Sequence, residues 1–210
     1  MSVIPFLSIS VGVRNENPNI ELAQQIIKKK DLKAIEELIV LLNAKQYQKD
    51  SIKVLYEIGY LKPEFISPYY NNFISLLKSK NNRLQWCAMT ALSCIVNIVP
   101  KELYANLPII LETADKGTVI TRDHAMKILA QLGKKKEYSK SIFPLAIEQL
   151  QSCPTNQLPM YAELTMQMVE KSMAKTFLQT LYQRLQYLEY EPKRKRIEKV
   201  ILTIQKKYSF

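Results

Sequence analysis

Three residues that could act together in catalysis recur at a constant spacing along the chain. Asp50, Cys87 and His124 follow one another at intervals of 37 positions, and His124 is the only histidine among the 210 residues. A carboxylate, an imidazole and a thiol together form an activated cysteine nucleophile, and they are also metal ligands. Either chemistry requires a fold that stacks residues 37 positions apart.

The order of these three residues argues against both kinds of chemistry. Cys87 lies between the other two, so the Asp50 carboxylate would have to reach past the thiol to orient the imidazole. A metal ion would lack a fourth ligand and the ligand spacing of zinc motifs. With only four glycines, the chain also lacks the glycine-rich loops that bind phosphates or dinucleotides. We therefore interpret the row as packing, and we favour a non-enzymatic protein without cofactor, metal or small-molecule substrate.

The same interval of 37 residues governs the apolar pattern. CAMTALSCI at 87–95 is followed by HAMKILAQL at 124–132, and residues spaced i, i+3, i+4 and i+7 share one face of a helix. Four successive copies place small or apolar side chains and two hydroxyls in four slots. The slots are Ser51, Ala88, Ala125 and Ala162; Val54, Ala91, Ile128 and Thr165; Leu55, Leu92, Leu129 and Met166; Ile58, Ile95, Leu132 and Val169. This ladder predicts one amphipathic helix per repeat, buried by its neighbours.

Residues that start and stop helices follow the same interval. Asn81, Thr118 and Thr155 stand where an N-cap would accept backbone amide hydrogens. Gly59 and Gly133 stand where a helix could end in a left-handed turn. The pattern therefore predicts helical hairpins.

Prolines mark the partner helices. Pro63 and Pro100 stand where these helices would begin, and Pro108 and Pro144 should begin or bend two others.

The run NLPIILETADKGTVITRDHAMKILAQLG at 106–133 resembles the HEAT repeat, with an internal proline, a short turn, and Arg122 three positions before Ala125. The resemblance implies an all-α, HEAT/armadillo-like solenoid of about five helical hairpins, whose second helices line a concave groove that binds a partner. We expect a single repeat domain over 1–210. It would comprise an extended arm at 1–16, a helical pair at 17–45, regular repeats at 46–172 and C-terminal helices with a basic cap at 173–210.

Composition narrows the setting of the protein. The net charge of +11 favours an acidic partner, such as nucleic acid or an acidic protein. Three cysteines without metal-ligand spacing indicate a reduced, cytoplasmic location. No apolar stretch approaches the roughly 18 residues of a membrane span. The apolar start MSVIPFLSISVGV lacks a basic lead and reads as an arm that packs on the first helices, and we expect no membrane partner.

Two groups of residues are candidates for partner binding. The first, here called the groove row, lies opposite the buried slots and combines aromatic, polar and charged side chains that suit a protein or peptide partner. It consists of Lys49, Lys53, Tyr56, Tyr60, Trp86, Thr90, Asn97, Asp123 and Lys127. The second is a basic patch near the C-terminus, made of Lys193, Arg194, Lys195, Arg196 and Lys199, which suits nucleic acid or an acidic partner, or acts only as a solubilising end-cap.

A protein-binding scaffold is the function that this arrangement favours. The alternative is nucleic-acid binding, because the size, charge and repeats are also similar to the HEAT-like alkylpurine DNA glycosylases, which use groove aromatics and an acidic residue. Trp86, Tyr56 and Asp123 are the nearest equivalents here. Those enzymes present several groove aromatics and arginines, whereas this chain has a single Trp.

Overall fold

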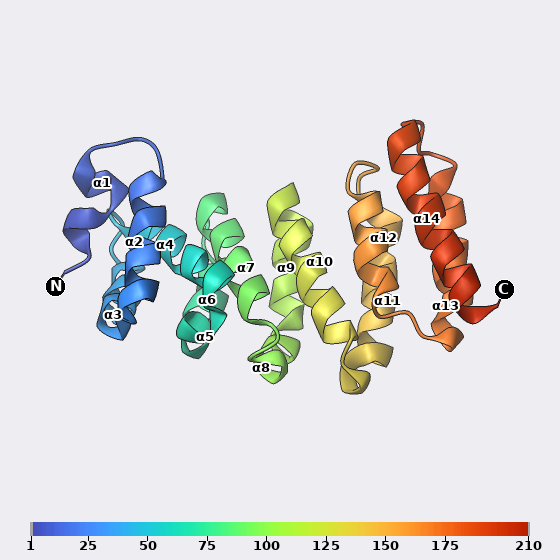
Figure 1. The fold of residues 1–210 in the computed structure, drawn as a ribbon, viewed down its shortest axis with the longest axis horizontal. Coiled ribbons are helices and arrows are strands. Elements are labelled where there is room, and N and C mark those ends of the chain that lie inside the picture. Colours follow the sequence, from blue (N-terminus) through green and yellow to red (C-terminus); the bar gives the residue numbers. More distant parts are fainter. Residues whose placement is uncertain (1, 210) are drawn as a thin grey trace. The chain divides into compact units, whose positions relative to one another are not determined.

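The computed structural model describes residues 2–209, and every regular element within them is a helix. The predicted all-α solenoid is confirmed (Figure 1). Internal contacts divide the chain into two compact units, the first ending at Ala125 and the second beginning at Met126. The division falls within helix α10 (Val119–Gly133). The two units are described separately.

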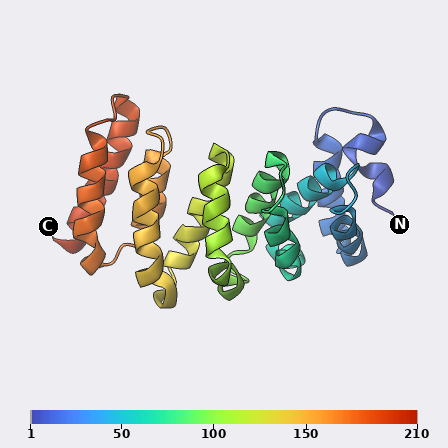
Figure 2. The same ribbon diagram turned by 180° about the vertical axis from the view of Figure 1, so that it is seen from behind.

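In the first unit, three helices lie side by side in one layer: α2 (Asn17–Lys29), α4 (Gln48–Leu61) and α7 (Asn82–Ile95). A second layer packs against α4 and α7, and its members are α3 (Leu32–Leu41), α5 (Pro63–Ile66) and α6 (Tyr70–Leu76). The remaining elements are η1 (Ile4–Phe6), α1 (Ser8–Val11), η2 (Ser67–Tyr69), α8 (Pro100–Ala105) and α9 (Leu107–Lys116). Figures 1 and 2 show the layers from opposite sides. Helix α4 is thus flanked on both sides within its own layer, by α2 and α7, and is covered on a third side by α3 and α5.

The second unit repeats this arrangement. Helices α12 (Leu158–Met166) and α14 (Glu191–Tyr208) are neighbours in one layer. Helices α11 (Lys136–Ser152) and α13 (Lys171–Leu185) contact each other and support α12 and α14 respectively. The sequence therefore builds the same two-layer unit at both ends of the chain.

Burial of the predicted ladder is confirmed in nearly every slot. Leu55, Leu92 and Leu129 are fully buried, and so are the small residues of the first slot. Met166 is the exception, because α12 ends there and leaves it half-exposed. Between α12 and α14 the interval is 35 residues and no longer 37. The buried residues of α14 are Ile197, Val200, Ile201 and Ile204, and each lies 35 positions after its counterpart in the fourth copy, in order Ala162, Thr165, Met166 and Val169.

The prediction that Gly59 and Gly133 end helices in a left-handed turn is wrong. Both lie within the bounds of helices, and Gly12 is the only glycine of the described chain with positive φ. A Cβ on Gly59 would lie 2.7 Å from Ile66 Cδ1 and 3.1 Å from Cys94 Cβ, and one on Gly133 would overlap Met168 Sδ. These glycines allow neighbouring elements to approach closely, which is a packing requirement and not a conformational one.

The predicted caps are correct in part. The Asn81 side chain accepts a hydrogen bond from Arg83 N at 2.9 Å, which makes Asn81 a true N-cap. Thr118 precedes α10, and its Oγ1 lies 3.5 Å from Thr121 N. Thr155 is not a cap, because α12 begins only at Leu158.

Proline placement splits two partner helices. Pro63 and Pro100 begin α5 and α8, as predicted. Pro68 and Pro108 lie in the first turns of further helices in the same two segments. One expected partner helix is therefore divided into α5, η2 and α6, and the other into α8 and α9. Pro144, by contrast, lies inside the continuous helix α11.

The N-terminal arm folds into short helical turns, so the prediction of an extended conformation is wrong. Val3 and Leu7 are buried against the first helices. The Glu37 carboxylate accepts a hydrogen bond from Val3 N at 2.9 Å, and Asn19 Oδ1 accepts one from Ser8 N at 3.0 Å. The arm therefore covers part of the apolar side of α2.

Candidate functional site

The groove row is divided by burial. Lys49, Tyr60 and Asn97 are exposed, and Trp86, Asp123 and Lys127 are half-buried. The remaining three, Lys53, Tyr56 and Thr90, are buried. Lys127 belongs to the second unit and the other eight residues to the first.

The structure therefore places Lys53, Tyr56 and Thr90, three of the residues expected to line the groove, inside the protein. A helix flanked by neighbours in its own layer, as α4 is by α2 and α7, buries well over half of its circumference. Thr90 is 1% exposed, and its hydroxyl donates a hydrogen bond to Trp86 O at 2.8 Å. A geometric argument from one helix alone overlooks these lateral neighbours.

Lys53 is a buried cation at the centre of an ion cluster that connects three segments, and its acidic partners are partly exposed. Its Nζ lies 2.6 Å from Glu57 Oε1 on the same helix and 3.1 Å from Glu16 Oε2, just before α2. Glu16 also pairs with Arg83 of α7. Burial alone would lower the pKa of Lys53, but hydrogen bonds with Glu57, Tyr56 and Glu16 outweigh burial and hold the pKa above its ordinary value. Lys53 is therefore charged and fixed in place.

Three aromatic side chains, Tyr56, Tyr60 and Trp86, pack next to this ion cluster. The Lys53 ammonium lies 4.7 Å from the centroid of the Tyr56 ring. Tyr56 in turn contacts Tyr60 edge-on, with ring centroids 5.8 Å apart, and Trp86 at 6.1 Å with the rings tilted by 51°. Burial raises the pKa of Tyr56 to about 12, so the phenol stays neutral. Tyr56 is a support, and Tyr60 and Trp86 form the accessible edge.

The Asp50–Cys87–His124 row does not form a catalytic group. The Asp50 carboxylate accepts a hydrogen bond from Ile9 N at 2.8 Å, so it anchors the arm. Cys87 is 1% exposed, and burial raises the pKa of its thiol to about 12, which opposes thiolate formation. His124 Nδ1 lies 2.8 Å from Ser93 Oγ, a contact that the sequence did not suggest.

Ser93 is not activated as a nucleophile by this contact. Its hydroxyl also donates to Thr90 O at 2.7 Å, which is consistent with a chain in which His124 Nδ1–H donates to the serine and the serine donates to the backbone. Within residues 2–209, no group of three His, Cys, Asp or Glu side chains is placed to hold a metal ion.

The buried thiol gives a pH-dependent stability that can be measured. Because the folded state raises the pKa of Cys87 from 9.0 to about 12, it holds the thiol proton more tightly than the unfolded chain does. The free energy of unfolding should therefore fall by about 1 kcal/mol as the pH rises from 8 to 10. Urea unfolding at both pH values should show a smaller loss in Cys87→Ala. Equal losses in the two proteins would contradict this assignment.

The predicted basic patch is largely used within the chain. Arg196 binds Glu163 of α12 through two hydrogen bonds of 2.8 and 2.7 Å, and Arg194 donates to Leu185 O at 3.3 Å. Lys193 donates to Asn156 Oδ1, and its Nζ also lies 5.5 Å from the Tyr190 ring centroid. The four consecutive residues KRKR at 193–196 point in different directions around the axis of α14, so they do not form one surface. Only Lys195 and Lys199 of the five are exposed lysines on a common side.

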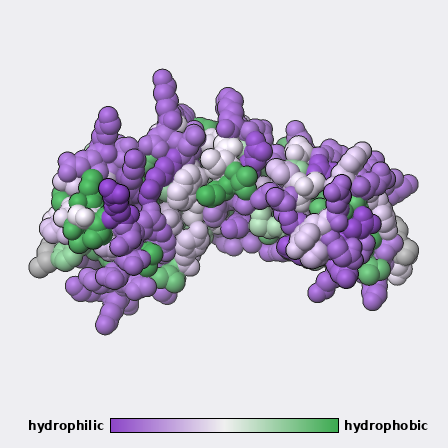
Figure 3. Space-filling model, turned by 90° about the horizontal axis from the view of Figure 1, so that it is seen from above, coloured by the Kyte–Doolittle hydropathy of each residue, from purple (hydrophilic) through white to green (hydrophobic). Residues whose placement is uncertain are grey.

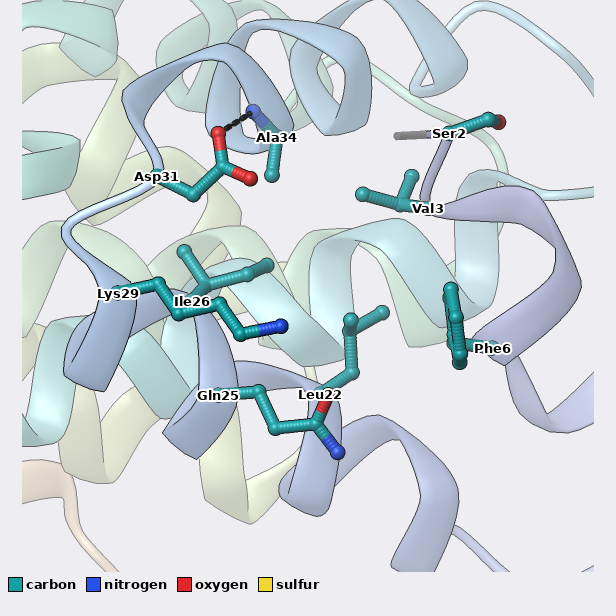
Figure 4. Close-up of a pocket in the computed structure, with 9 residues that line it drawn as sticks. All are labelled: Ser2, Val3, Phe6, Leu22, Gln25, Ile26, Lys29, Asp31 and Ala34. Atoms are coloured by element: carbon teal, nitrogen blue, oxygen red, sulfur yellow. Dashed lines mark hydrogen bonds between the residues drawn. The ribbon is translucent and has the colours of Figure 1, made fainter.

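Of the small hollows that border the N-terminal arm, two reach beyond α2 to other helices. One of about 60 Å³ lies between the arm and α2, where Val3 and Phe6 face Leu22 and Ile26 and the Asp31 carboxylate caps α3 through Ala34 N (Figure 4). The other, of about 190 Å³, is bordered by Arg14, Lys49 and Arg83 among others. Both are smaller than the usual volume of a small-molecule site.

The face of the molecule seen in Figure 3 is mainly hydrophilic. On the face seen in Figure 3, hydrophobic residues gather in small separate groups among hydrophilic ones. In the described part of the chain, none of the helices has both the length and the apolar character needed to span a bilayer.

Comparison with known proteins supports the fold alone. No protein-family model and no curated protein matches the chain. Two engineered proteins of known crystal structure are similar, each with 16% sequence identity. One has a TM-score of 0.64 over 98% of both chains, and the other 0.66 over 92% of this chain and 94% of its own. A designed armadillo repeat protein, 13% identical, has a TM-score of 0.65 over 88% of this chain and 86% of its own. The chain thus has an armadillo-like helical-repeat fold.

Proposed function

We propose that this protein is a scaffold that binds a peptide or protein segment on the exposed face of α4 and α7. The observation that carries the proposal is the aromatic edge of Tyr60 and Trp86, held by Tyr56 and by the buried Lys53 cluster. Tyr60 is 54% exposed although it lies beside a fully packed core. An aromatic side chain that is fixed before binding loses little conformational entropy when a partner covers it.

The neighbouring side chains suit a polypeptide partner. Asn97 and Lys49 are exposed at the two ends of this face, and Asn97 can both donate to and accept from a peptide backbone. Around the aromatic edge, Lys53 and Arg83 are matched by Glu57 and Glu16, so the local surface carries little unpaired charge. Hot spots in protein interfaces combine such aromatic anchors with a polar rim.

Base stacking has less support at this face. In the resemblance to DNA glycosylases, Tyr56 would be one of the stacking residues, but it is only 5% exposed and its ring is already covered by Tyr60, Trp86 and Lys53. A base requires an open ring face on which to stack. This leaves polypeptide as the partner class that fits the face best.

A displayed library of random peptides, selected on the complete protein, tests the proposal. We expect enriched peptides whose affinity, measured by fluorescence anisotropy, falls at least about tenfold in Tyr60→Ala and further in Tyr60→Ala/Trp86→Ala. The control is Tyr187→Ala/Tyr190→Ala, which removes two exposed tyrosines outside this face and should change affinity less than about twofold. Failure to enrich any peptide, or equal losses in both variants, would refute it.

A further inference from the structure

The excess positive charge of the protein is concentrated in the second unit. From Met126 onward there are fifteen Lys and Arg residues against seven Glu, a net charge of +8, whereas the first unit has fifteen against twelve, a net charge of +3. Much of this charge lies on α14, the last helix of the array. Aligning the buried residues of α14 with those of α4 shows which lysines of α14 are open to a partner.

The burial pattern of α14 aligns it with α4. Ile197 occupies the first buried slot, which Ser51 occupies in α4. Counting from that slot, the four positions that correspond to Lys49, Lys53, Tyr56 and Tyr60 are, in order, Lys195, Lys199, Leu202 and Lys206. These four residues, here called the lysine row, occupy in α14 the positions that correspond to the groove-row positions of α4.

Unlike its counterpart in α4, the lysine row is open along its whole length. All four residues are exposed, and Leu202 is 54% exposed between two lysines. Among the described residues, Lys199 and Lys206 take part in no ion pair, and Lys195 has only a solvent-exposed contact with Glu191 at 3.5 Å. An exposed pair of this kind contributes little and is easily exchanged for another carboxylate.

Apolar side chains lie beside these charges on α12. The two hydrogen bonds between Glu163 and Arg196 bring the exposed sides of α12 and α14 together. Met160 and Leu164, which flank Glu163 on α12, are both half-exposed. The surface therefore offers aliphatic contacts next to three separate ammonium groups.

We infer that the lysine row binds an acidic polypeptide segment in which carboxylates alternate with apolar side chains. Charge complementarity selects the acidic partner, and Leu202 with Met160 and Leu164 selects one that also presents apolar groups. A nucleic acid fits less well, because its unbroken line of phosphates would meet Glu163, Glu191 and Glu198 and would leave Leu202 unused. The inference rests on the proposed scaffold function and extends it to the chemistry of the partner.

Labelled synthetic probes and the complete protein provide the test. The probes are a peptide of repeated Glu-Glu-Leu, its Lys-Lys-Leu and Glu-Glu-Ser counterparts, and a single-stranded RNA of similar length. We expect the Glu-Glu-Leu peptide to bind most tightly, and its affinity to fall at least about tenfold in Lys195→Glu/Lys199→Glu/Lys206→Glu and severalfold in Leu202→Ser. The control Lys78→Glu/Lys80→Glu/Lys101→Glu reverses three exposed charges of the first unit and should have less than about a twofold effect.

Each other outcome overturns the inference in a defined way. Equal weakening in the control would mean that only net charge matters, and equal binding of the Glu-Glu-Ser peptide would remove the role of Leu202. Tighter binding of RNA would assign the surface to nucleic acid, and absence of binding by every probe would leave it without a ligand. Library peptides that depend on Tyr60 but bind the Lys195/Lys199/Lys206 variant normally would preserve the scaffold function while this inference fails.

Discussion

Leu92→Ala should lower the free energy of unfolding by about 3–5 kcal/mol, the largest effect that we expect from a single substitution in this protein. Leu92 is fully buried on α7, which packs between α4 and α6, so the neighbouring helices cannot collapse into the space that the side chain leaves. The cost therefore includes both the lost transfer free energy and the cavity. Urea unfolding followed by circular dichroism measures it.

Leu61→Ala is the matched control for this experiment. It removes the same atoms from α4, but Leu61 is 58% exposed, so the change should stay within about 0.5 kcal/mol. A similar loss in both variants would show that the ladder is not the core of the fold. A small loss in Leu92→Ala would lead to the same conclusion.

The ladder was predictable because burial of a helix face leaves a periodic trace in the sequence. Leu55, Leu92 and Leu129 recur at a fixed interval, and the structure buries all three. The trace fails where the interval itself changes, as it does between α12 and α14, whose corresponding buried residues are 35 positions apart. A single sequence does not reveal that shift, since the residues at the old interval, Lys199 and Lys206 among them, are compatible with any exposed helix position.

The glycines show a second limit of sequence reasoning. The sequence predicts a left-handed helix end at Gly59 and Gly133, which is a common use of glycine near a helix end. Their actual neighbours, Ile66 and Met168, come from other elements, and close approach between elements is invisible until the fold is known. Among the glycines of the described residues, only Gly12 combines a helix end with positive φ, and Lys30 and Ser209 take the same left-handed conformation at two other helix ends.

The candidate site was predicted less well than the core, and the reason is lateral packing. Tyr60 and Trp86 were placed correctly on an accessible side, but Lys53 and Tyr56 are covered by neighbours within the same layer. The Glu57 partner of Lys53 could have been found from the i, i+4 spacing on one helix. Glu16 lies one interval of 37 residues before Lys53, but it belongs to the arm, before the segment in which the ladder is visible, so its contact with Lys53 was missed. Arg83 lies 30 positions after Lys53 and joins the cluster only by pairing with Glu16.

Lys53→Met should cost about 2–3 kcal/mol of unfolding free energy at neutral pH, measured by urea titration. Methionine preserves the apolar stem but leaves Glu57, whose carboxylate is 20% exposed, without the ammonium at 2.6 Å. Removing one member of a buried pair is expensive because the other charge remains desolvated, and the partial exposure of Glu57 and Glu16 keeps the cost below that of a fully buried pair. The raised pKa of Lys53 means that its contribution is fully present at neutral pH and is lost only in strong alkali.

A double variant separates the ion pair from simple packing. Lys53→Met/Glu57→Gln removes both charges, so it should be more stable than Lys53→Met alone, because no unpaired carboxylate remains. Lys116→Met is the control, since Lys116 and Glu112 have the same i, i+4 spacing and a 2.7 Å contact but are exposed to solvent, and no measurable change is expected. If the double variant is no more stable than the single one, the cluster stabilises the protein through its aliphatic contacts, and the support of the aromatic edge does not depend on charge.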